Sequence, residues 1–201
     1  MKLYYTPGAC SIHPHIALCE AGIPHTIERV DLKAKKTESG ADYLAINPKG
    51  YIPALQLDNG QVLAEGVAIV QYIADQKPES GLAPKAGTME RYRLQEWLTF
   101  FSSELHKQFS PLFNAAIPDD VKKIFRDKIV GRFAYLDKHL AGKSYVMGEQ
   151  FTVADGYLYN MLRWAKRVEM DLSAYPNVTA FEKRVEARPK VVEALKAEGL
   201  M

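Results

Sequence analysis

The chain has 201 residues, of which 47% are hydrophobic and 25% are charged, and this composition excludes a disordered protein. The 26 basic residues are dispersed among 24 acidic residues, so we do not expect nucleic acid as the main ligand. No basic leader precedes an apolar run at the N-terminus, and no later stretch is apolar enough to span a membrane. We therefore expect a soluble, cytoplasmic protein that does not bind a membrane.

Short strand and helix signals alternate over the first eighty residues. They predict strands over 2–6 and 25–32, helices over 10–21 and 65–76, and a hairpin whose strands lie in 53–57 and 61–63. The hairpin turn is indicated by Asn59 and Gly60, because Asn-Gly between two apolar runs is the strongest short-range hairpin signal.

The rest of the chain has a different pattern. Residues 77–88 are rich in proline, glycine and serine, which indicates a linker over 78–88. Beyond it, apolar residues recur at helical spacing over 89–113, 121–140, 153–168 and 178–187. An α/β domain over 1–77 is thus expected to precede an all-helical domain over 89–201.

One of these helices begins with a local folding signal. Thr152 can cap the helix while Asp155, three residues later, reaches back to the backbone N–H of the cap, which is the capping-box pattern. We expect the loss of Asp155 to cost about 1 kcal/mol of stability.

Cys10 is the first candidate for chemistry. It follows a Pro-Gly turn at the predicted start of a helix, where free N–H groups and the helix dipole stabilise a thiolate. His13 stands where a second cysteine would complete a Cys-x-x-Cys motif, so a thiol reaction at Cys10 needs an external thiol. The alternative is a half-buried, inert thiol. Cys19 is interpreted as a core residue, about 13 Å along the same helix, so the two cysteines should not pair.

Other candidates lie on two further helices. Thr99, Ser103, His106 and Ser110 are spaced to share a polar helix face, which is a ligand site or simply a solvated surface. Glu65 and Gly66 begin a helix, where an anionic ligand carrying an ammonium group could bind, although a first-turn carboxylate is also a common stabilising charge. The sequence contains no Cys/His spacing typical of a zinc site.

Taken together, the motifs resemble a known family over the whole chain. They are KLYY, PGACS, VDL with Lys35 and KKT, NPKGYIPAL, LAEGVAIVQYIAD, SSELHKQFSPLF, FTVAD, RWA, ARPKV and AEGL. In this order the sequence resembles the cytosolic glutathione S-transferases, most closely the bacterial beta class. The resemblance implies a thioredoxin-like α/β N-terminal domain with a cis proline at Pro53, an all-α C-terminal domain and a homodimer.

The resemblance also implies where glutathione, the co-substrate, would bind. Its sulfur would lie at Cys10, its γ-glutamyl end near Glu65 and Gly66, and its cysteinyl portion against the backbone of Ile52. Lys35 and His106 would lie near its glycyl or sulfur end. The remaining glutathione-binding positions carried over from the family are Ser103, Glu104, Leu105 and Thr99. Thr99 would reach glutathione across the dimer, where relatives commonly carry asparagine.

Several functions remain open at this point. In conjugation to a small hydrophobic electrophile, Cys10 and His106 would hold glutathione as its thiolate. Alternatively, Cys10 forms a mixed disulfide with glutathione in thiol-disulfide exchange or reductive dehalogenation, or the chain is a non-catalytic binding protein of the same fold. No metal is expected in this chemistry. The expected walls of the electrophile pocket, each of which could instead be a core residue, are Tyr5, Phe109, Phe113 and Trp164.

His13 departs from the small residue that relatives often carry. It lies one helical turn from Cys10, so we hypothesise that the protonated imidazole lowers the pKa of the Cys10 thiol. The alternative is a side chain that simply faces solvent.

Overall fold

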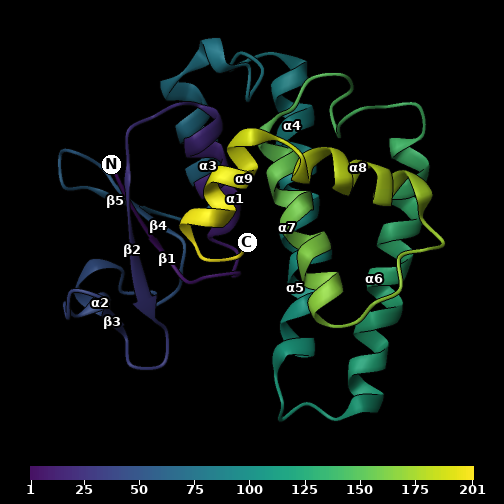
Figure 1. Ribbon diagram of the computed structural model, residues 1–201, viewed down its shortest axis with the longest axis horizontal. Coiled ribbons are helices and arrows are strands. Elements are labelled where there is room, and N and C mark those ends of the chain that lie inside the picture. Colours follow the sequence, from purple (N-terminus) through teal and green to yellow (C-terminus); the bar gives the residue numbers. More distant parts are fainter. The chain divides into compact units, whose positions relative to one another are not determined.

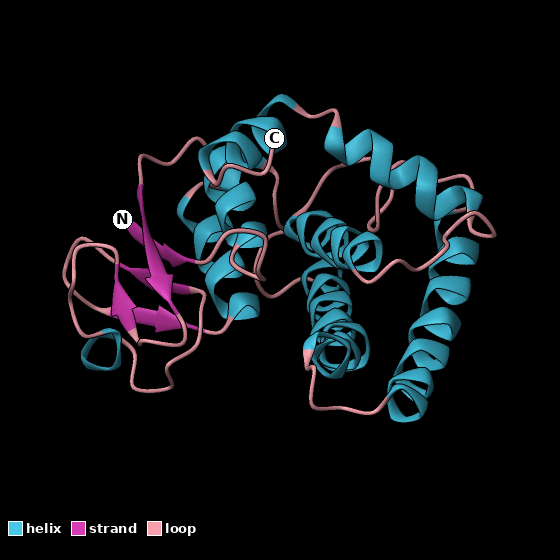
Figure 2. Cartoon of the chain, turned by 60° about the horizontal axis from the view of Figure 1, so that its bottom comes forward, coloured by secondary structure: helices cyan, strands magenta, loops and turns pink.

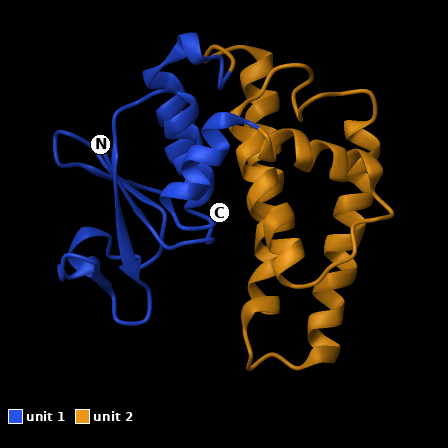
Figure 3. Cartoon of the chain, viewed as in Figure 1, with its two compact units in different colours: residues 1–83, 188–201 blue, residues 84–187 orange.

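The computed structural model describes all 201 residues, and these residues form two compact units. The first contains residues 1–83 and 188–201, and the second contains residues 84–187 (Figure 3). An α/β unit and an all-helical unit are what the sequence predicts. No helix combines the length and the apolar character that a membrane crossing requires.

The first unit is built on a five-stranded mixed sheet. Its strands are β1 (Lys2–Tyr5), β2 (Thr26–Asp31), β3 (Lys36–Thr37), β4 (Ala54–Gln56) and β5 (Val62–Ala64), in the order β3-β2-β1-β4-β5. β1 and β2 are parallel, and the other neighbours are antiparallel. The predicted β4–β5 hairpin is confirmed, as is the cis peptide bond between Ile52 and Pro53.

Helices cover this sheet. α1 (Ile12–Glu20) and α3 (Gly66–Gln76) lie on the same side of the strands, and α2 (Tyr43–Ile46) follows β3 (Figures 1 and 2). Within the expected linker, Pro78–Ser80 form a 3₁₀ turn. The boundary between the two units, after residue 83, also falls inside that segment.

The C-terminal segment belongs to the first unit. α9 (Pro189–Ala197) packs on α1, and the Arg188 guanidinium binds the Glu20 carboxylate through two hydrogen bonds of 2.6 and 2.7 Å. Residues 89–201 therefore do not form one compact unit. The helical domain expected over 89–201 thus ends earlier than predicted. The reason is that α9 packs within the first unit, where its apolar residues Val191 and Leu195 are fully buried.

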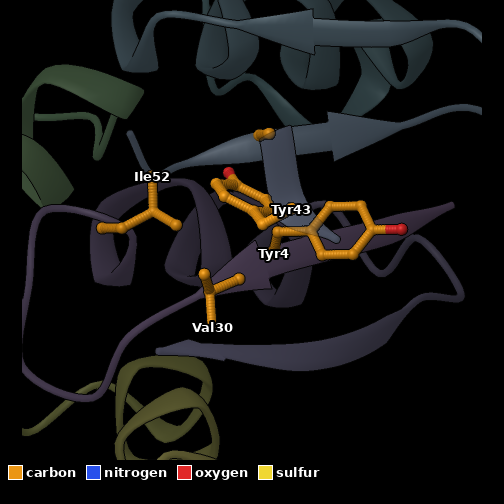
Figure 4. Close-up of a cluster of buried hydrophobic side chains, with 5 residues drawn as sticks. Tyr4, Val30, Tyr43 and Ile52 are labelled. Atoms are coloured by element: carbon orange, nitrogen blue, oxygen red, sulfur yellow. The ribbon is translucent and has the colours of Figure 1, made fainter. Parts of the chain in front are cut away.

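A small hydrophobic cluster supports the loop before β4. Figure 4 shows Tyr4, Val30, Tyr43 and Ile52 gathered around the strands. Each of the four is less than 10% exposed. Cys10 packs against the edge of this cluster. The cluster thus connects the turn that carries Cys10 to the sheet.

The second unit is entirely helical, but its first predicted helix is not continuous. α4 (Met89–Phe100) passes into a π-helix over Phe101–His106, a short α5 (Lys107–Phe109) and a 3₁₀ turn over Ser110–Phe113. A π-helical stretch changes the angular spacing of side chains. The simple 3.6-residue spacing used for Thr99, Ser103, His106 and Ser110 therefore does not hold along this segment.

Three longer helices complete the unit: α6 (Asp119–Leu140), α7 (Val153–Arg167) and α8 (Pro176–Glu186). α7 has the predicted capping box. The Asp155 carboxylate is fully buried and accepts hydrogen bonds of 2.7 Å from the backbone N–H groups of both Thr152 and Val146. The contact with Val146, a residue outside the helix, is one that the sequence did not predict.

We expect the Asp155→Ala substitution to lower the free energy of unfolding by about 3 kcal/mol, because it leaves two buried backbone donors without an acceptor. This exceeds the cost of about 1 kcal/mol expected for a cap alone. Urea unfolding measures the change, with Asp119→Ala, an exposed first-turn aspartate of α6, as the matched control. Equal effects of the two substitutions would contradict the role assigned to Asp155.

Candidate functional site

Cys10 lies in the turn between β1 and α1, two residues before the first residue of the helix. Its side chain is partly buried, and its thiol donates a hydrogen bond to the backbone carbonyl of Ile52, with Sγ 3.3 Å from the oxygen. The partner is the residue that precedes the cis proline. Cys10 and Ile52, expected near the sulfur and the cysteinyl portion of a ligand, are therefore in direct contact.

The carbonyl groups before Pro53 are all held by side chains. Lys35 Nζ donates to the Gly50 oxygen at 2.8 Å. The Tyr51 oxygen accepts hydrogen bonds from the Tyr43 hydroxyl at 2.7 Å and from Asn47 Nδ2 at 2.8 Å. With Cys10 on the Ile52 oxygen, three successive carbonyls have specific donors, which fixes the orientation of this segment. Lys35 is thus a supporting residue of the loop in addition to a candidate contact for a ligand.

The start of α3 is the second part of the candidate site in the first unit. Glu65 precedes the helix with φ +70°, a left-handed conformation that is uncommon for a residue other than glycine and often marks functional sites. Its carboxylate is largely exposed and forms an ion pair with Lys49 at 2.8 Å. The exposed carboxylate is available to an ammonium group, and the first N–H groups of α3 suit a carboxylate.

Gly66 is required by close packing. A Cβ atom at this position would lie 2.6 Å from two atoms of the His13 ring, which is closer than van der Waals contact allows. His13 itself is 2% exposed, so the alternative of a solvent-facing side chain is wrong: its ring is buried near the start of α3. The hypothesised influence of His13 on Cys10 stays a prediction.

In the second unit, the candidate residues cluster around the π-helix. Ser103 and Thr99 are exposed, and the Ser103 hydroxyl donates to the Thr99 carbonyl at 3.0 Å. Glu104 forms an ion pair with Arg132 at 2.6 Å. The side chain of Leu105 is fully buried, so only its backbone is available to a ligand.

His106 lies in a mostly apolar environment. Its Nδ1 is 2.7 Å from the hydroxyl of Tyr157, and its ring contacts Trp164 edge-on with a centroid distance of 4.8 Å. Burial, with a smaller effect of the Lys107 charge, lowers the pKa of His106 to about 4. The imidazole is therefore neutral at physiological pH. A Tyr157 hydroxyl that donates to Nδ1 leaves Nε2 with a proton that it can donate.

The expected aromatic pocket residues of the second unit are in mutual contact. The ring centroid of Trp164 lies 5.9 Å from that of Phe109 and 5.3 Å from that of Phe113. Phe109 is fully buried, whereas Phe113 is 42% exposed, so Phe113 is the member that can meet a ligand. Tyr5 lies in the first unit, at the end of β1, and is 8% exposed.

The structure thus collects Cys10, Lys35, Ile52, Glu65 and Gly66 around two loops of the first unit. It collects Thr99, Ser103, Glu104, Leu105, His106, Phe109, Phe113 and Trp164 in the second unit. Three residues of the site have no signal of their own in the sequence: Lys49, Asn47 and Tyr157. The motif NPKG contained the first two, but only the fold shows that Lys49 approaches Glu65. Tyr157 follows Asp155 in a run that indicated nothing beyond a helix start.

The chain is similar to known proteins along its whole length. The family model described as the glutathione S-transferase N-terminal domain matches residues 9–76, and the C-terminal domain model matches residues 100–189. The chain is 44% identical over 200 residues to glutathione S-transferase GstA of Escherichia coli O157:H7, with full coverage of both chains.

Solved structures extend the comparison. A bacterial beta-class glutathione S-transferase from Sphingomonas chungbukensis is 49% identical, with full coverage of both chains and a TM-score of 0.97. A sphingomonad glutathione S-transferase complexed with glutathione is 50% identical, again with full coverage of both, and has a TM-score of 0.96. The thioredoxin-like first unit followed by a helical unit is therefore confirmed.

We expect His106 to make stability depend on pH. Because its pKa is lowered to about 4 in the folded protein, the unfolded chain binds the proton more readily between that value and about 6.5. The contribution of His106 to the free energy of unfolding is therefore complete above about pH 6.5 and decreases as the pH falls toward 4. This contribution should fall by about 2 kcal/mol between pH 7.5 and pH 5. Urea unfolding at both pH values measures the change, and the free energy of unfolding should decrease less in His106→Gln than in the wild type. An equal decrease in the two proteins would contradict this role of His106.

The clash at Gly66 gives a second prediction. Gly66→Ala should destabilise the protein by about 1–3 kcal/mol, because the new methyl group must displace the His13 ring. Adding His13→Ala should relieve part of that cost, so the double variant should be more stable than the sum of the two single effects. A double-mutant cycle by thermal unfolding measures this coupling, and strict additivity would contradict it.

Proposed function

Because the chain belongs to the glutathione S-transferase family, and within it to the bacterial beta class, we propose that Cys10 and His106 act on the sulfur of glutathione, the co-substrate. The chain is a glutathione transferase. What is proposed is the role of each residue, the class of the second substrate, and the ability of Cys10 to form a mixed disulfide.

The hydrogen bond from the Cys10 thiol to the Ile52 carbonyl carries this proposal. It directs the sulfur of Cys10 toward the peptide segment against which the cysteinyl portion of glutathione would lie. A ligand placed there brings its own sulfur close to Cys10. Glu65 would receive the ammonium group of the γ-glutamyl end, and the N–H groups that begin with Gly66 would receive its carboxylate.

His106 would supply a neutral hydrogen-bond donor. With Nδ1 bound to the Tyr157 hydroxyl, Nε2–H can donate to the glutathione thiolate without a change in the charge of the ring. The low pKa of His106 makes this function independent of pH above about 6. Ser103, Glu104 and the backbone of Leu105 lie on the same helical stretch and are proposed as further contacts to glutathione.

The second substrate is proposed to be a small hydrophobic electrophile. The support is the group formed by Phe109, Phe113 and Trp164, of which Phe113 is substantially exposed. In conjugation, the glutathione thiolate attacks the electrophilic carbon, a carbon–sulfur bond forms, and the leaving group departs with its electron pair. Tyr5 is proposed as a further contact of the electrophile.

Thiol-disulfide exchange, including its use in reductive dehalogenation, is the second chemistry that this site supports. The Cys10 thiolate would attack one sulfur of oxidised glutathione, so that a mixed disulfide forms and one glutathione thiolate leaves. A second glutathione would then resolve the mixed disulfide.

The family resemblance supports two further proposals. The chain forms a homodimer in which Thr99 reaches the neighbouring glutathione, and the protein is located in the cytoplasm.

Mass spectrometry of the intact protein after incubation with oxidised glutathione tests the role of Cys10. We expect one glutathione adduct, mapped to Cys10 by digestion, in the wild type and in Cys19→Ala, and none in Cys10→Ala. Cys19 is a matched control because it is on the same turn-helix segment but is buried, and burial raises the pKa of its thiol to about 12.

Kinetics of the same variants distinguish the two chemistries. Cys10→Ala should abolish disulfide exchange but slow conjugation to a halonitroarene only about ten- to hundredfold. That is the loss of one hydrogen bond to a charged sulfur, which the Cys10 thiol donates by turning its proton from the Ile52 carbonyl to glutathione. An adduct on Cys19, or none at all, would rule out the mixed disulfide. Unchanged conjugation by Cys10→Ala would remove Cys10 from the transferase reaction.

A further inference from the structure

A second group of reactive side chains lies in the first unit, toward the C-terminal end of α1. It consists of His15, Cys19 and His25, and one ligand atom of each lies within 4.8 Å of the other two. His15 and Cys19 are separated by one turn of α1 and share a face of the helix, while His25 lies just before β2. The glutathione chemistry described above uses none of the three.

The hydrogen bonds of the two imidazoles select which nitrogens are available. Nδ1 of His15 is 2.9 Å from the Glu198 carboxylate, and Nδ1 of His25 is 2.7 Å from the Ile23 carbonyl. Because a carboxylate and a carbonyl only accept, Nδ1 of each ring is the donor, and Nε2 is the nitrogen that can coordinate a cation. Metal-bound histidines in proteins are oriented by this type of outer hydrogen bond.

We propose that His15, Cys19 and His25 bind a single Zn²⁺ ion through two imidazole nitrogens and one thiolate, with a water molecule as the fourth ligand. Two nitrogen donors and one sulfur donor form a set that suits this borderline cation. Binding replaces the thiol proton of Cys19 by the cation and releases that proton to solvent.

The dimensions and burial of the cluster suit such an ion. Tetrahedral zinc holds nitrogen and sulfur ligands roughly 3.5 Å from one another, so small side-chain rotations close the site. His15 and Cys19 are 2% and 4% exposed, whereas His25 is half-buried and leaves a route for the ion from solvent. The apolar surroundings raise the pKa of the Cys19 thiol to about 12, and a bound cation relieves that cost of ionisation.

The nearby charges favour a cation. Beyond the effect of burial, three carboxylates raise the pKa of the Cys19 thiol by their charge: those of Glu193, Glu20 and Glu198. The ammonium group of Lys190 opposes them. Lys190 is itself paired with Glu193 at 2.6 Å, and Glu20 with Arg188. Glu198 is a fully buried carboxylate: one of its oxygens lies 2.9 Å from Nδ1 of His15, and the other has no hydrogen-bond donor. A positive ion on His15 would compensate this buried charge.

A cation here would connect three parts of the first unit: α1, the segment that leads into β2, and, through Glu198, the C-terminal tail beyond α9. It would stabilise this unit without taking part in the transfer of glutathione. Sequence spacing alone did not indicate the site, because His25 reaches the other two residues only when the chain turns back at Gly22.

Titration with Co²⁺, a spectroscopic substitute for Zn²⁺, tests the proposal. The full-length Cys10→Ser protein is used so that Cys19 is the only thiol. We expect one Co²⁺ per chain, with a thiolate-to-metal charge-transfer band and the intense visible bands of a tetrahedral site, both lost when Zn²⁺ is added. The binding should raise the midpoint of thermal unfolding.

Variants locate the site. Cys10→Ser/Cys19→Ser should lose the charge-transfer band, and Cys10→Ser/His25→Gln should bind Co²⁺ at least tenfold more weakly. His25 is half-buried, so its substitution leaves the core intact. The matched control is Cys10→Ser/His139→Gln, because His139 is also partly buried and bonded to a backbone carbonyl but lies on α6. Absence of a charge-transfer band in Cys10→Ser, its persistence without Cys19, or equal effects of the His25 and His139 substitutions would overturn the proposal.

Discussion

The first half of the site depends on the fixed orientation of three carbonyl groups, those of Gly50, Tyr51 and Ile52. Each is bound by a side chain from a different place in the chain: Lys35, the pair Tyr43 and Asn47, and Cys10. A loop whose carbonyls are bound in this way cannot rotate its peptide groups without breaking several hydrogen bonds. The thiol of Cys10 is thereby held against the rigid peptide of Ile52, although neither Cys10 nor Ile52 lies in a helix or strand.

Much of the fold could be predicted because local signals agree with tertiary structure. The hairpin around Asn59 and Gly60 and the capping box at Asp155 are both present. The cis bond before Pro53, which the family resemblance implies, is present as well. Two features could not be read from periodicity. The helix predicted over 89–113 changes its winding at Phe101, where a π-helical stretch begins that apolar spacing does not distinguish from an α-helix. The C-terminal residues have ordinary helical spacing, which does not say which unit the helix joins.

The sequence indicates which residues are candidates for the site, but it does not indicate the surroundings of those residues. Cys10 and Glu65 are indicated by their positions at predicted helix starts, His106 by its place on a polar helix face, and all three by the family resemblance. The partners that set their properties are distant in sequence: Ile52 for Cys10, Lys49 for Glu65 and Tyr157 for His106. A single sequence contains no record of such pairs, since each depends on how segments separated by 16 to 51 residues pack together.

The histidines of this chain illustrate why residue type alone does not define chemistry. His13 is buried where a side chain at Gly66 would collide with it, and the position therefore demands glycine at the start of α3. His15 is equally buried, but its Nδ1 meets a carboxylate, which orients the ring and leaves Nε2 as the nitrogen that can coordinate a cation. His106 meets a phenol and aromatic rings, which keep it neutral and make it a donor. His13 and His15 are buried and His106 is partly buried, so exposure does not distinguish their roles; the partner of each ring decides between packing, metal coordination and hydrogen bonding to sulfur.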